Sequence, residues 1–234
     1  MNQSYILSCE HAGNLVPARY HSLFKGKEDV LYTHKAIDFG ALRLAQHLKQ
    51  ESGLPLYYTL HSRLLVEANR SPDNEELFSD YTSALEETEK KSILEEYYYP
   101  HRRQVQDKIS QLLADGRAVI QLAAHTFTPV LEGKTREADM GILFDPERPM
   151  EQAFADALKQ ELLAQNPSRK VLYNSPYPGT DDSFPAYLRK CFSKEQYGGI
   201  ELEVNQKFFL NGDASIWETL LAEISAAFLA VIRK

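Results

Sequence analysis

Two kinds of apolar segment alternate along the chain. Short runs rich in apolar, β-branched and aromatic residues are typical of buried strands, whereas longer segments with apolar residues three or four positions apart are typical of helices. The short runs predict strands at about 4–9, 54–60, 118–127, 141–145, 170–174 and 199–206. The longer segments predict helices at 37–53, 85–98, 100–116 and near 150–165. This alternation favours an α/β sheet covered on both faces, in a single domain over residues 1–234.

The most apolar segment is IWETLLAEISAAFLAVIRK at the C-terminus. Its large apolar residues recur at helical spacing, and Glu218 and Glu223 interrupt it. A helix that spans a bilayer needs about 20 predominantly apolar residues. We therefore expect an amphipathic helix packed on the core, and no membrane partner.

Composition narrows the class of protein. The 234 residues are 43% hydrophobic and 25% charged, which is typical of a soluble globular protein and not of a disordered one. The formal net charge of −7 argues against a nucleic-acid partner, because nonspecific binding needs a basic surface. Cys9 and Cys191 are too few for a disulfide framework and the N-terminus has no evident secretory signal, so we expect a cytoplasmic protein. The sequence indicates no oligomer interface.

Ionisable and polar side chains follow four of the predicted strands. They are Glu10–His11, His61–Arg63, His125–Thr126 and Glu203–Asn205. In α/β sheets, ligands bind beyond the carboxyl ends of the strands. We therefore expect these groups to meet in one site.

The residue types at these strand ends suit a metal ion. A catalytic zinc site uses three protein ligands from His, Asp and Glu and keeps one position open. His11 and His125 can meet if their strands are neighbours, and Asp38, at the start of the first helix, can add a carboxylate. Spacing alone leaves other interpretations open, because His11 can bond a neighbouring carbonyl and Asp38 can cap the helix.

A second set of residues suits a substrate that carries a carboxylate. Asn69 and Arg70 are adjacent, and Arg63 lies seven positions before Arg70. A guanidinium binds a carboxylate through two parallel hydrogen bonds. The alternative is that the two arginines form surface ion pairs with Glu67 or Asp73.

The last predicted strand carries two carboxylates on one face. Alternation places Glu201 and Glu203 on that face, and Ile200, Leu202 and Val204 on the other. If the strand is internal, both carboxylates must face a polar cavity; otherwise they are solvated.

Cys9 offers a different mechanism. A cysteine amidase needs a thiolate stabilised by a histidine, and alternation places Cys9 and His11 on the same face of the first strand. That mechanism leaves Arg63, Arg70 and Glu203 without a common purpose. We therefore favour the metal site and expect Cys9 to be a small buried hydrophobic residue.

Five motifs together resemble one known family. CEHAGNLVP, AIDFGA, HSRLLVEANR, AAHTF and IELEVNQ, in this order over roughly residues 5–206, are similar to those of the N-formylglutamate amidohydrolase family, a relative of the zinc carboxypeptidases and aspartoacylases. The resemblance implies a three-layer α/β/α fold with a mixed, mostly parallel sheet, of the phosphorylase/hydrolase-like and zinc carboxypeptidase-like kind. It also implies one zinc ion per chain, although two histidines and a carboxylate suit other divalent metals as well.

The resemblance also implies roles for individual residues. Carried over by position, the zinc ligands are His11, Asp38 and His125, the substrate-binding residues are Asn69 and Arg70, and the catalytic residues are Arg63 and Glu203. Arg70 would hold the α-carboxylate of the substrate, Arg63 would polarise the scissile carbonyl, and Glu203 would act as general base on zinc-bound water. The implied reaction is hydrolysis of N-formyl-L-glutamate, a small-molecule N-acyl amino acid, to formate and L-glutamate. A catalytically inactive relative that binds N-acyl amino acids is the alternative in another functional class.

The chain departs from the family at two positions near the implied metal. Asn14 stands where the relatives' H-x-x-E pairing has a glutamate, so Glu10 and His34 remain candidates for the ligand assigned to Asp38. Glu67 stands where we expect an aspartate, before the Asn-Arg pair.

Two later segments are expected to border the site. The loop at 173–185 has three prolines and a glycine, and loops of this kind often shape a pocket. We expect Asn174 and Tyr177 to contact the substrate there. Arg136 and Asp139, which follow the second histidine, can pair with each other or contact the substrate, and we expect the pair.

Overall fold

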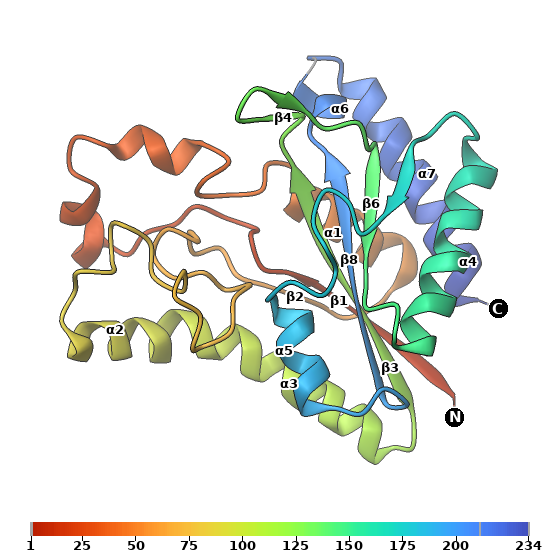
Figure 1. The fold of residues 1–234 in the computed structure, drawn as a ribbon, viewed down its shortest axis with the longest axis horizontal. Helices are drawn as coiled ribbons and strands as arrows, with labels where there is room; N and C mark the ends of the chain where they lie inside the picture. Colours follow the sequence, from red (N-terminus) through yellow and green to blue (C-terminus); the bar gives the residue numbers. More distant parts are fainter. Residues whose placement is uncertain (1, 211, 234) are drawn as a thin grey trace.

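Six strands form one mixed sheet in the computed structural model, which describes residues 2–210 and 212–233 (Figure 1). In order across the sheet they are β2 (Leu56–Tyr58), β1 (Gln3–Cys9), β3 (Ala118–Phe127), β8 (Tyr197–Asn205), β6 (Met140–Leu143) and β7 (Val171–Tyr173). Every neighbouring pair is parallel except β8 and β6, which are antiparallel. The short strands β4 (Val130–Leu131) and β5 (Lys134–Thr135) form a separate hairpin.

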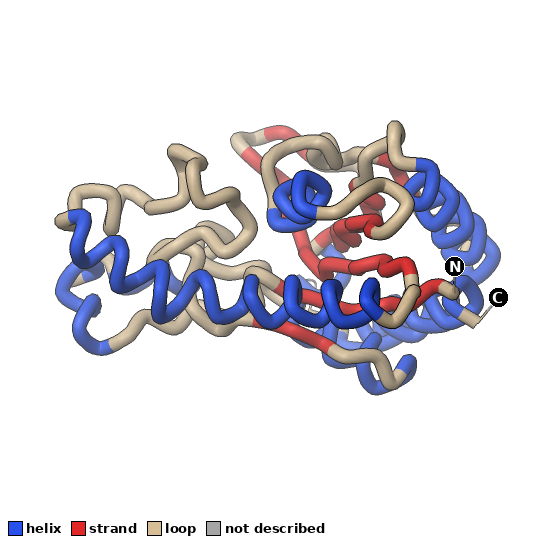
Figure 2. Tube along the Cα trace, turned by 90° about the horizontal axis from the view of Figure 1, so that it is seen from below, coloured by secondary structure: helices blue, strands red, loops and turns tan. Residues whose placement is uncertain are grey.

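Helices cover both faces of the sheet (Figure 2). One face carries α1 (Ala41–Ser52), α4 (Pro149–Gln165) and α7 (Ala214–Ile232), and the other carries α3 (Tyr99–Ala114) and α5 (Phe184–Cys191). Leu7 and Ile200 pack into the first core, whereas Ile6 and Val119 pack into the second. Successive residues of β1 thus enter opposite cores, as strand alternation requires. The predicted three-layer α/β/α class with a mixed, mostly parallel sheet is confirmed.

Helix α7 is long and apolar enough to cross a membrane, by length and composition alone. Its large apolar residues, among them Trp217, Leu220 and Phe228, are buried in the core that α1 and α4 also line. The single-turn helix α6 (Lys207–Leu210) packs beside it. Helix α7 is therefore a packed core helix, as the spacing of its apolar residues predicts.

Two elements differ from the prediction. Helix α1 begins at Ala41 and not near residue 37, because Gly40 before it has a left-handed φ of 87°, which glycine adopts without strain. Asp38 therefore lies in the loop before the helix and does not cap it. Helix α5, which the apolar pattern does not predict, begins inside the expected 173–185 loop, where the Ser183 hydroxyl accepts a hydrogen bond from the N–H of Ala186.

Residues 10–40 and 59–98 form a lobe beside the sheet (Figure 1). Its regular elements are the 3-10 helices Ala18–Phe24 and Glu28–Tyr32, helix α2 (Glu87–Ile93) and a π-helical turn at Leu94–Tyr98. Its own small core contains Tyr20, Leu65, Leu77 and Tyr98. The two parts of this lobe follow β1 and β2 in the chain, so they begin at the carboxyl ends of those strands.

Gly13 permits a close approach of the two segments that leave the sheet. A Cβ atom at this position would lie 2.3 Å from the carbonyl oxygen of Leu60, which is too close for any side chain. The next hydrogen bond, from the N–H of Leu15 to the same carbonyl at 2.9 Å, fixes this contact. It holds the segment after β1, which carries His11, against the segment after β2.

Candidate active site

His11, Asp38 and His125 meet beyond the carboxyl ends of β1 and β3. One ligand atom from each lies within 4.8 Å of the others, and all three side chains are buried. Strands β1 and β3 are adjacent and parallel, so the histidines at their ends lie side by side. Asp38 is brought to them from the loop before α1, where its backbone N–H donates to the carbonyl of His11 at 3.2 Å.

Both histidines face Asp38 through the same ring atom. The Nδ1 atoms of His11 and His125 each lie 3.1 Å from Oδ2 of Asp38. Two imidazole nitrogens and one carboxylate oxygen form the donor set that zinc takes in hydrolases. These three atoms could hold a metal ion, whereas the other ring atoms face away from the shared point.

Carboxylates hold the opposite edges of both rings. Nε2 of His11 lies 2.5 Å from Oε1 of Glu67, and Nε2 of His125 lies 3.1 Å from Oε2 of Glu10. The other oxygen of Glu10 lies 3.3 Å from Nε2 of His101, on helix α3. A carboxylate that accepts the Nε2 proton fixes the imidazole in the tautomer that leaves Nδ1 free for a metal.

The charges of this cluster fit a cation at the shared point. Burial would lower the pKa of both histidines, but the neighbouring carboxylates outweigh it and raise the pKa of His11, and that of His125 well above its usual value. Burial would raise the pKa of Asp38, but the histidines and Arg63 hold it well below its usual range. The carboxylates of Asp38, Glu67 and Glu10 thus surround the two rings with negative charge, which favours a cation at the shared point.

Geometry distinguishes Asp38 from the two other candidates for the third ligand. Glu10 lies behind His125, on the Nε2 side of its ring. His34 is exposed at the edge of a cavity. Asn14, which replaces the expected glutamate, points elsewhere and donates to the carbonyl of Leu31 at 2.8 Å.

Arg63 links the carboxylates around the histidines. Its Nε donates to Oε2 of Glu67 at 2.6 Å, and its Nη1 lies 3.4 Å from Oδ1 of Asp38. Burial would raise the pKa of Glu67, but Arg63 and His11 outweigh it and hold it well below its usual range. The Arg63–Glu67 contact is thus part of the buried site and not the surface ion pair that the sequence left open. Glu67 reaches both His11 and Arg63.

Asn69 and Arg70 lie at the other end of the site. The side chain of Asn69 donates to Oε1 of Glu201 at 3.0 Å and accepts from the N–H of Phe184 at 2.8 Å. Arg70 donates through Nη1 to the carbonyl of Asp182 at 2.9 Å, and its Nη2 has no hydrogen bond within residues 2–210 and 212–233. Arg70 thus has a free edge, whereas most of the amide of Asn69 is occupied.

Glu203 on β8 faces the same site as the histidines. Ile200, Leu202 and Val204 enter the apolar core, and Glu201 and Glu203 line a cavity, so the predicted alternation is confirmed. Oε2 of Glu203 is buried without a hydrogen bond from any residue that the structure describes. Burial raises the pKa of Glu203 to about 7, and the charges of Asp38 and Glu201 add to this rise, although His125 opposes it.

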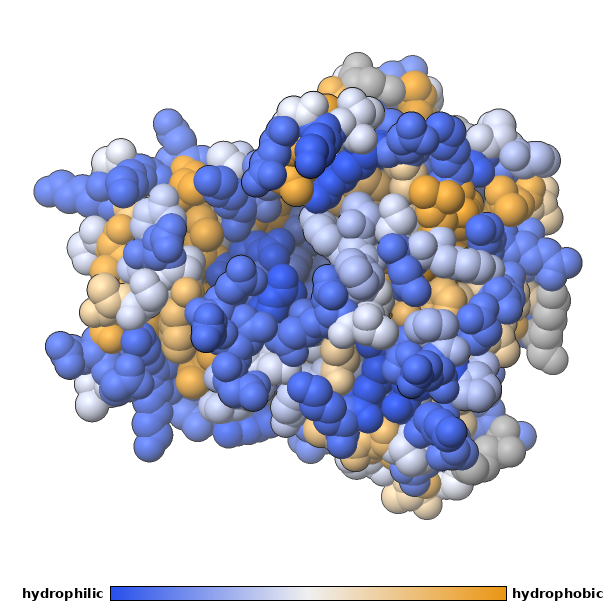
Figure 3. Space-filling view, viewed as in Figure 1, coloured by the Kyte–Doolittle hydropathy of each residue, from blue (hydrophilic) through white to orange (hydrophobic). Residues whose placement is uncertain are grey.

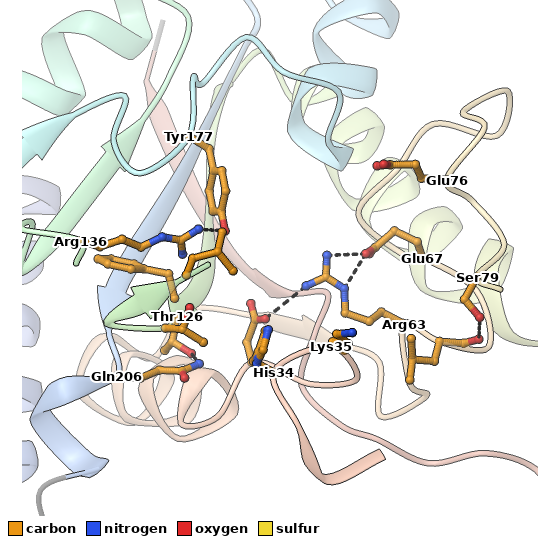
Figure 4. A pocket seen from close by; sticks show the side chains of 15 residues that line it. His34, Lys35, Arg63, Glu67, Glu76, Ser79, Thr126, Arg136, Tyr177 and Gln206 are labelled. Atoms are coloured by element: carbon orange, nitrogen blue, oxygen red, sulfur yellow. Dashed lines mark hydrogen bonds and ion pairs between the residues drawn. The ribbon is translucent and has the colours of Figure 1, made fainter. Parts of the chain in front are cut away.

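Two connected cavities open onto these groups. The inner cavity, of about 170 Å³, is lined by His11, Asp38, Arg63, Asn69, Arg70, His125, Thr126, Leu143, Tyr177, Pro178, residues 181–183, Glu201 and Glu203. The outer cavity, of about 420 Å³, is lined by the residues in Figure 4, and it shares Asp38, Arg63, Thr126 and Tyr177 with the inner one. Figure 3 shows hydrophilic residues around the hollow between the lobe and the sheet. The lobe and the sheet thus each contribute residues to the lining of both cavities.

Two residues that were expected at the site, Asn174 and His61, lie outside both cavities, whereas Tyr177 and Cys9 lie where they were expected. Tyr177 lines both cavities, but Asn174 lines neither, because its side chain accepts hydrogen bonds from the N–H groups of Phe144 and Gly179. Cys9 is fully buried in the apolar core, and burial raises the pKa of its thiol well above the usual value. The ring of His61 contacts that of Tyr97 in a tilted arrangement, and His61 lines neither cavity.

Sequence reasoning missed the carboxylates behind the histidines. Glu67 drew attention as a departure from the family and as an ion-pair partner of the arginines, and Glu10 as a strand-end group and an alternative ligand, but neither as the partner of a histidine. Their partners, His11 and His125, are 56 and 115 positions away in the chain, so no local pattern connects them. A polar residue inside an apolar strand end was the only signal for Glu10.

Comparisons with known proteins agree with the fold. A family model described as N-formylglutamate amidohydrolase matches residues 3–210. Among solved structures, a gene product of Agrobacterium tumefaciens is 27% identical, with a TM-score of 0.79, over 98% of this chain and 88% of that chain. The N-formylglutamate amidohydrolase from Ralstonia eutropha is 14% identical, with a TM-score of 0.69, over 98% and 92% of the two chains. No curated protein sequence matches the chain.

The cluster predicts a defined metal content. We expect about one zinc ion per purified wild-type chain by plasma mass spectrometry, and none in His11→Ala or His125→Ala, because each variant loses one of three ligands. His47→Ala is the control, since His47 bonds Ser225 on the far side of α1, and it should keep its metal. Retention of stoichiometric zinc by both ligand variants would contradict the site.

The raised pKa of Glu203 predicts a pH-dependent stability of the metal-free protein. The folded state holds the Glu203 proton up to about pH 7, whereas the unfolded chain releases it near the ordinary value of 4.5. The contribution of Glu203 to the free energy of unfolding therefore decreases as the pH rises from about 4.5 to about 7, and it stays low at higher pH. Glu203→Gln removes this loss, so its Tm should exceed that of wild type by roughly 5 °C at pH 8 and by little at pH 5. Equal differences at the two pH values in calorimetry would contradict the assignment.

Proposed function

The chain belongs to the N-formylglutamate amidohydrolase family, and we propose that it is a metal-dependent amidohydrolase that cleaves the amide bond of an N-acyl amino acid. The family makes N-formyl-L-glutamate, with formate and L-glutamate as products, the first substrate to assay. The observation that carries the proposal is Oε2 of Glu203, which is buried without a hydrogen bond from any described residue and belongs to the carboxylate that lines the same cavity as His11, Asp38 and His125. A buried carboxylate with a pKa near neutrality can both accept and return a proton.

We assign zinc to the Nδ1 atoms of His11 and His125 and to Oδ2 of Asp38. Zinc bound there would lower the pKa of a coordinated water and polarise the carbonyl of the amide. The donor set supports zinc but also suits other divalent metals. The hydrogen bond between Nε2 of His11 and Glu67 supports this assignment, because it favours the tautomer that the assignment requires. Glu10 lies 3.1 Å from Nε2 of His125, on the side away from the proposed metal.

Glu203 is assigned as the general base. It would take a proton from the attacking water and then pass it to the nitrogen of the leaving amino acid. Two observations support this role. Glu203 lies on an internal strand of the sheet, next to the strand that carries His125. No other described side chain forms a hydrogen bond with its Oε2. Glu201, on the same face, is less suited because Asn69 already donates to it.

The arginines are assigned to the two ends of the amide. Arg63 borders both cavities with a side chain that is 25% exposed, which supports contact with the scissile carbonyl. Arg70 would hold the α-carboxylate through its free Nη2, and the remaining amide hydrogen of Asn69 would assist it. Tyr177 would close the cavity over the substrate.

We further propose that these roles belong to one metallohydrolase domain in the cytoplasm, where Cys9 and Cys191 stay free.

The test of the base is Glu203→Gln in the zinc-loaded enzyme. We expect release of glutamate from N-formyl-L-glutamate to slow by a factor on the order of 10²–10⁴, while the zinc content stays at the wild-type value. Glu201→Gln is the matched control, since it removes the neighbouring charge on the same strand face and should slow turnover far less.

Two results would contradict the assignment. A Glu203→Gln rate within a few fold of wild type would exclude Glu203 as the base. Absence of turnover in zinc-loaded wild type, for N-formyl, N-acetyl and N-succinyl amino acids alike, would exclude the amidohydrolase function itself and favour a relative that only binds such compounds.

A further inference from the structure

The outer cavity has no role in cleavage of a formyl group. It opens from the inner cavity at Asp38, Arg63, Thr126 and Tyr177, whereas Arg70 lines only the inner cavity. If Arg70 holds the α-carboxylate, the acyl side of the amide extends from the metal site towards the outer cavity. A formyl group has a single carbon, so it would leave the outer cavity, with its volume of about 420 Å³, empty.

Two cations on the wall of the outer cavity have no acidic partner. Arg136 donates through Nη2 to the hydroxyl of Tyr177 at 2.8 Å, and neither it nor Lys35 forms an ion pair with any residue in 2–210 or 212–233 (Figure 4). The expected pair of Arg136 with Asp139 is wrong, because Asp139 contacts the ammonium group of Lys207. In a chain with a formal net charge of −7, unpaired cations that face one cavity favour an anionic ligand.

The surroundings hold the guanidinium of Arg136 in place. Its central carbon lies 4.9 Å from the ring centre of Tyr177 and 5.7 Å from that of Phe127. An arginine fixed between aromatic rings loses little conformational entropy when it binds a carboxylate through two hydrogen bonds.

The carboxylates that border the outer cavity are already engaged. Asp38 and Glu67 contact Arg63, and Glu76 lies 3.7 Å from Arg70. The pKa of His34 is lowered, first by partial burial and then by the charges of Lys35, Arg63 and Arg136. Lys35 and Arg136 are thus the two cations of this lining that have no ion-pair partner among the described residues, whereas its three carboxylates all contact arginines.

We propose that the outer cavity is a subsite for an acyl group that itself carries a carboxylate, such as succinyl, which Arg136 and Lys35 bind. This inference rests on the proposed function and specifies the class of substrate. Water would add across the amide bond, so that the acyl carbon takes the hydroxyl, the nitrogen takes the proton, and the products are a dicarboxylate and a free amino acid. The enzyme would then act best on N-acyl amino acids with an anion at both ends.

The experiment compares N-formyl-, N-acetyl- and N-succinyl-L-glutamate in the zinc-loaded enzyme. For wild type we expect kcat/KM for the succinyl compound to exceed that for the acetyl compound by about tenfold or more, since a hydrogen bond to a charged group is lost in the latter. Arg136→Gln should lower this succinyl-to-acetyl ratio by about tenfold, and Lys35→Gln should lower it in the same direction.

Two further variants separate a subsite from general effects of charge or binding. Lys134→Gln removes an exposed cation from strand β5 of the β4–β5 hairpin, two positions before Arg136 and outside both cavities. It should leave the succinyl-to-acetyl ratio unchanged. Arg70→Gln should lower kcat/KM for all three substrates alike, and so should also leave the ratio unchanged. Lys35 is exposed, so its variant tests the subsite even if Arg136→Gln fails to fold.

The outcomes distinguish this inference from the proposed function. Turnover of the formyl compound with no preference for succinyl over acetyl, or an unchanged ratio in both Arg136→Gln and Lys35→Gln, would overturn the subsite and leave the amidohydrolase intact. A fall of the ratio in Lys134→Gln equal to that in Arg136→Gln would also overturn it, since the preference would then reflect overall charge. Failure to cleave any of the three compounds would overturn both.

Discussion

The shared contact of two histidine Nδ1 atoms with one oxygen of Asp38 is the interaction around which the site is organised. It places ionisable groups where water cannot solvate them, and a charge in such a position is stable only when an opposite charge lies beside it. The chain meets this requirement by placing carboxylates beside the histidines and an arginine beside the carboxylates. Glu67 and Glu10 contact the outer edges of the rings, and Arg63 contacts both Glu67 and Asp38. Oε2 of Glu203 is buried without a hydrogen bond from any residue that the structure describes, and burial raises the pKa of this carboxyl.

The same constraint explains why the fold has a sheet and an irregular lobe. The sheet supplies rigid positions, with His11 and His125 at the ends of adjacent strands and Glu203 on the next strand. The lobe supplies Arg63 and Glu67 from loops, which can approach the strand ends at angles that strands cannot reach. Close packing at Gly13 and the left-handed turn at Gly40 make this approach possible. Because neither part has the whole site, contacts such as Asn69 with Glu201, which join the two parts, stabilise both the fold and the active-site geometry.

Local patterns predicted those parts of the structure that local physics determines. The continuous apolar run at 118–127 is strand β3, and the alternation around residue 200 correctly placed Glu203 opposite an apolar face. The partners of charged residues could not be predicted in this way, since they depend on contacts between segments far apart in the chain. Arg136 was expected to pair with Asp139, three positions away, but its neighbour in space is Tyr177. Asn174 has the composition of a pocket residue, yet its carbonyl is used to hold the turn that carries Tyr177.

The account depends most directly on which atoms hold the metal. The decisive measurement is anomalous diffraction at the zinc absorption edge from crystals of the zinc-loaded protein. We predict one peak per chain, about 2.0–2.2 Å from Nδ1 of His11, Nδ1 of His125 and an oxygen of Asp38. Nε2 of His11 should still be hydrogen-bonded to Glu67, and Nε2 of His125 should still face Glu10. A peak ligated through either Nε2 atom, or held by Glu10 or Glu67 in place of Asp38, would contradict the account.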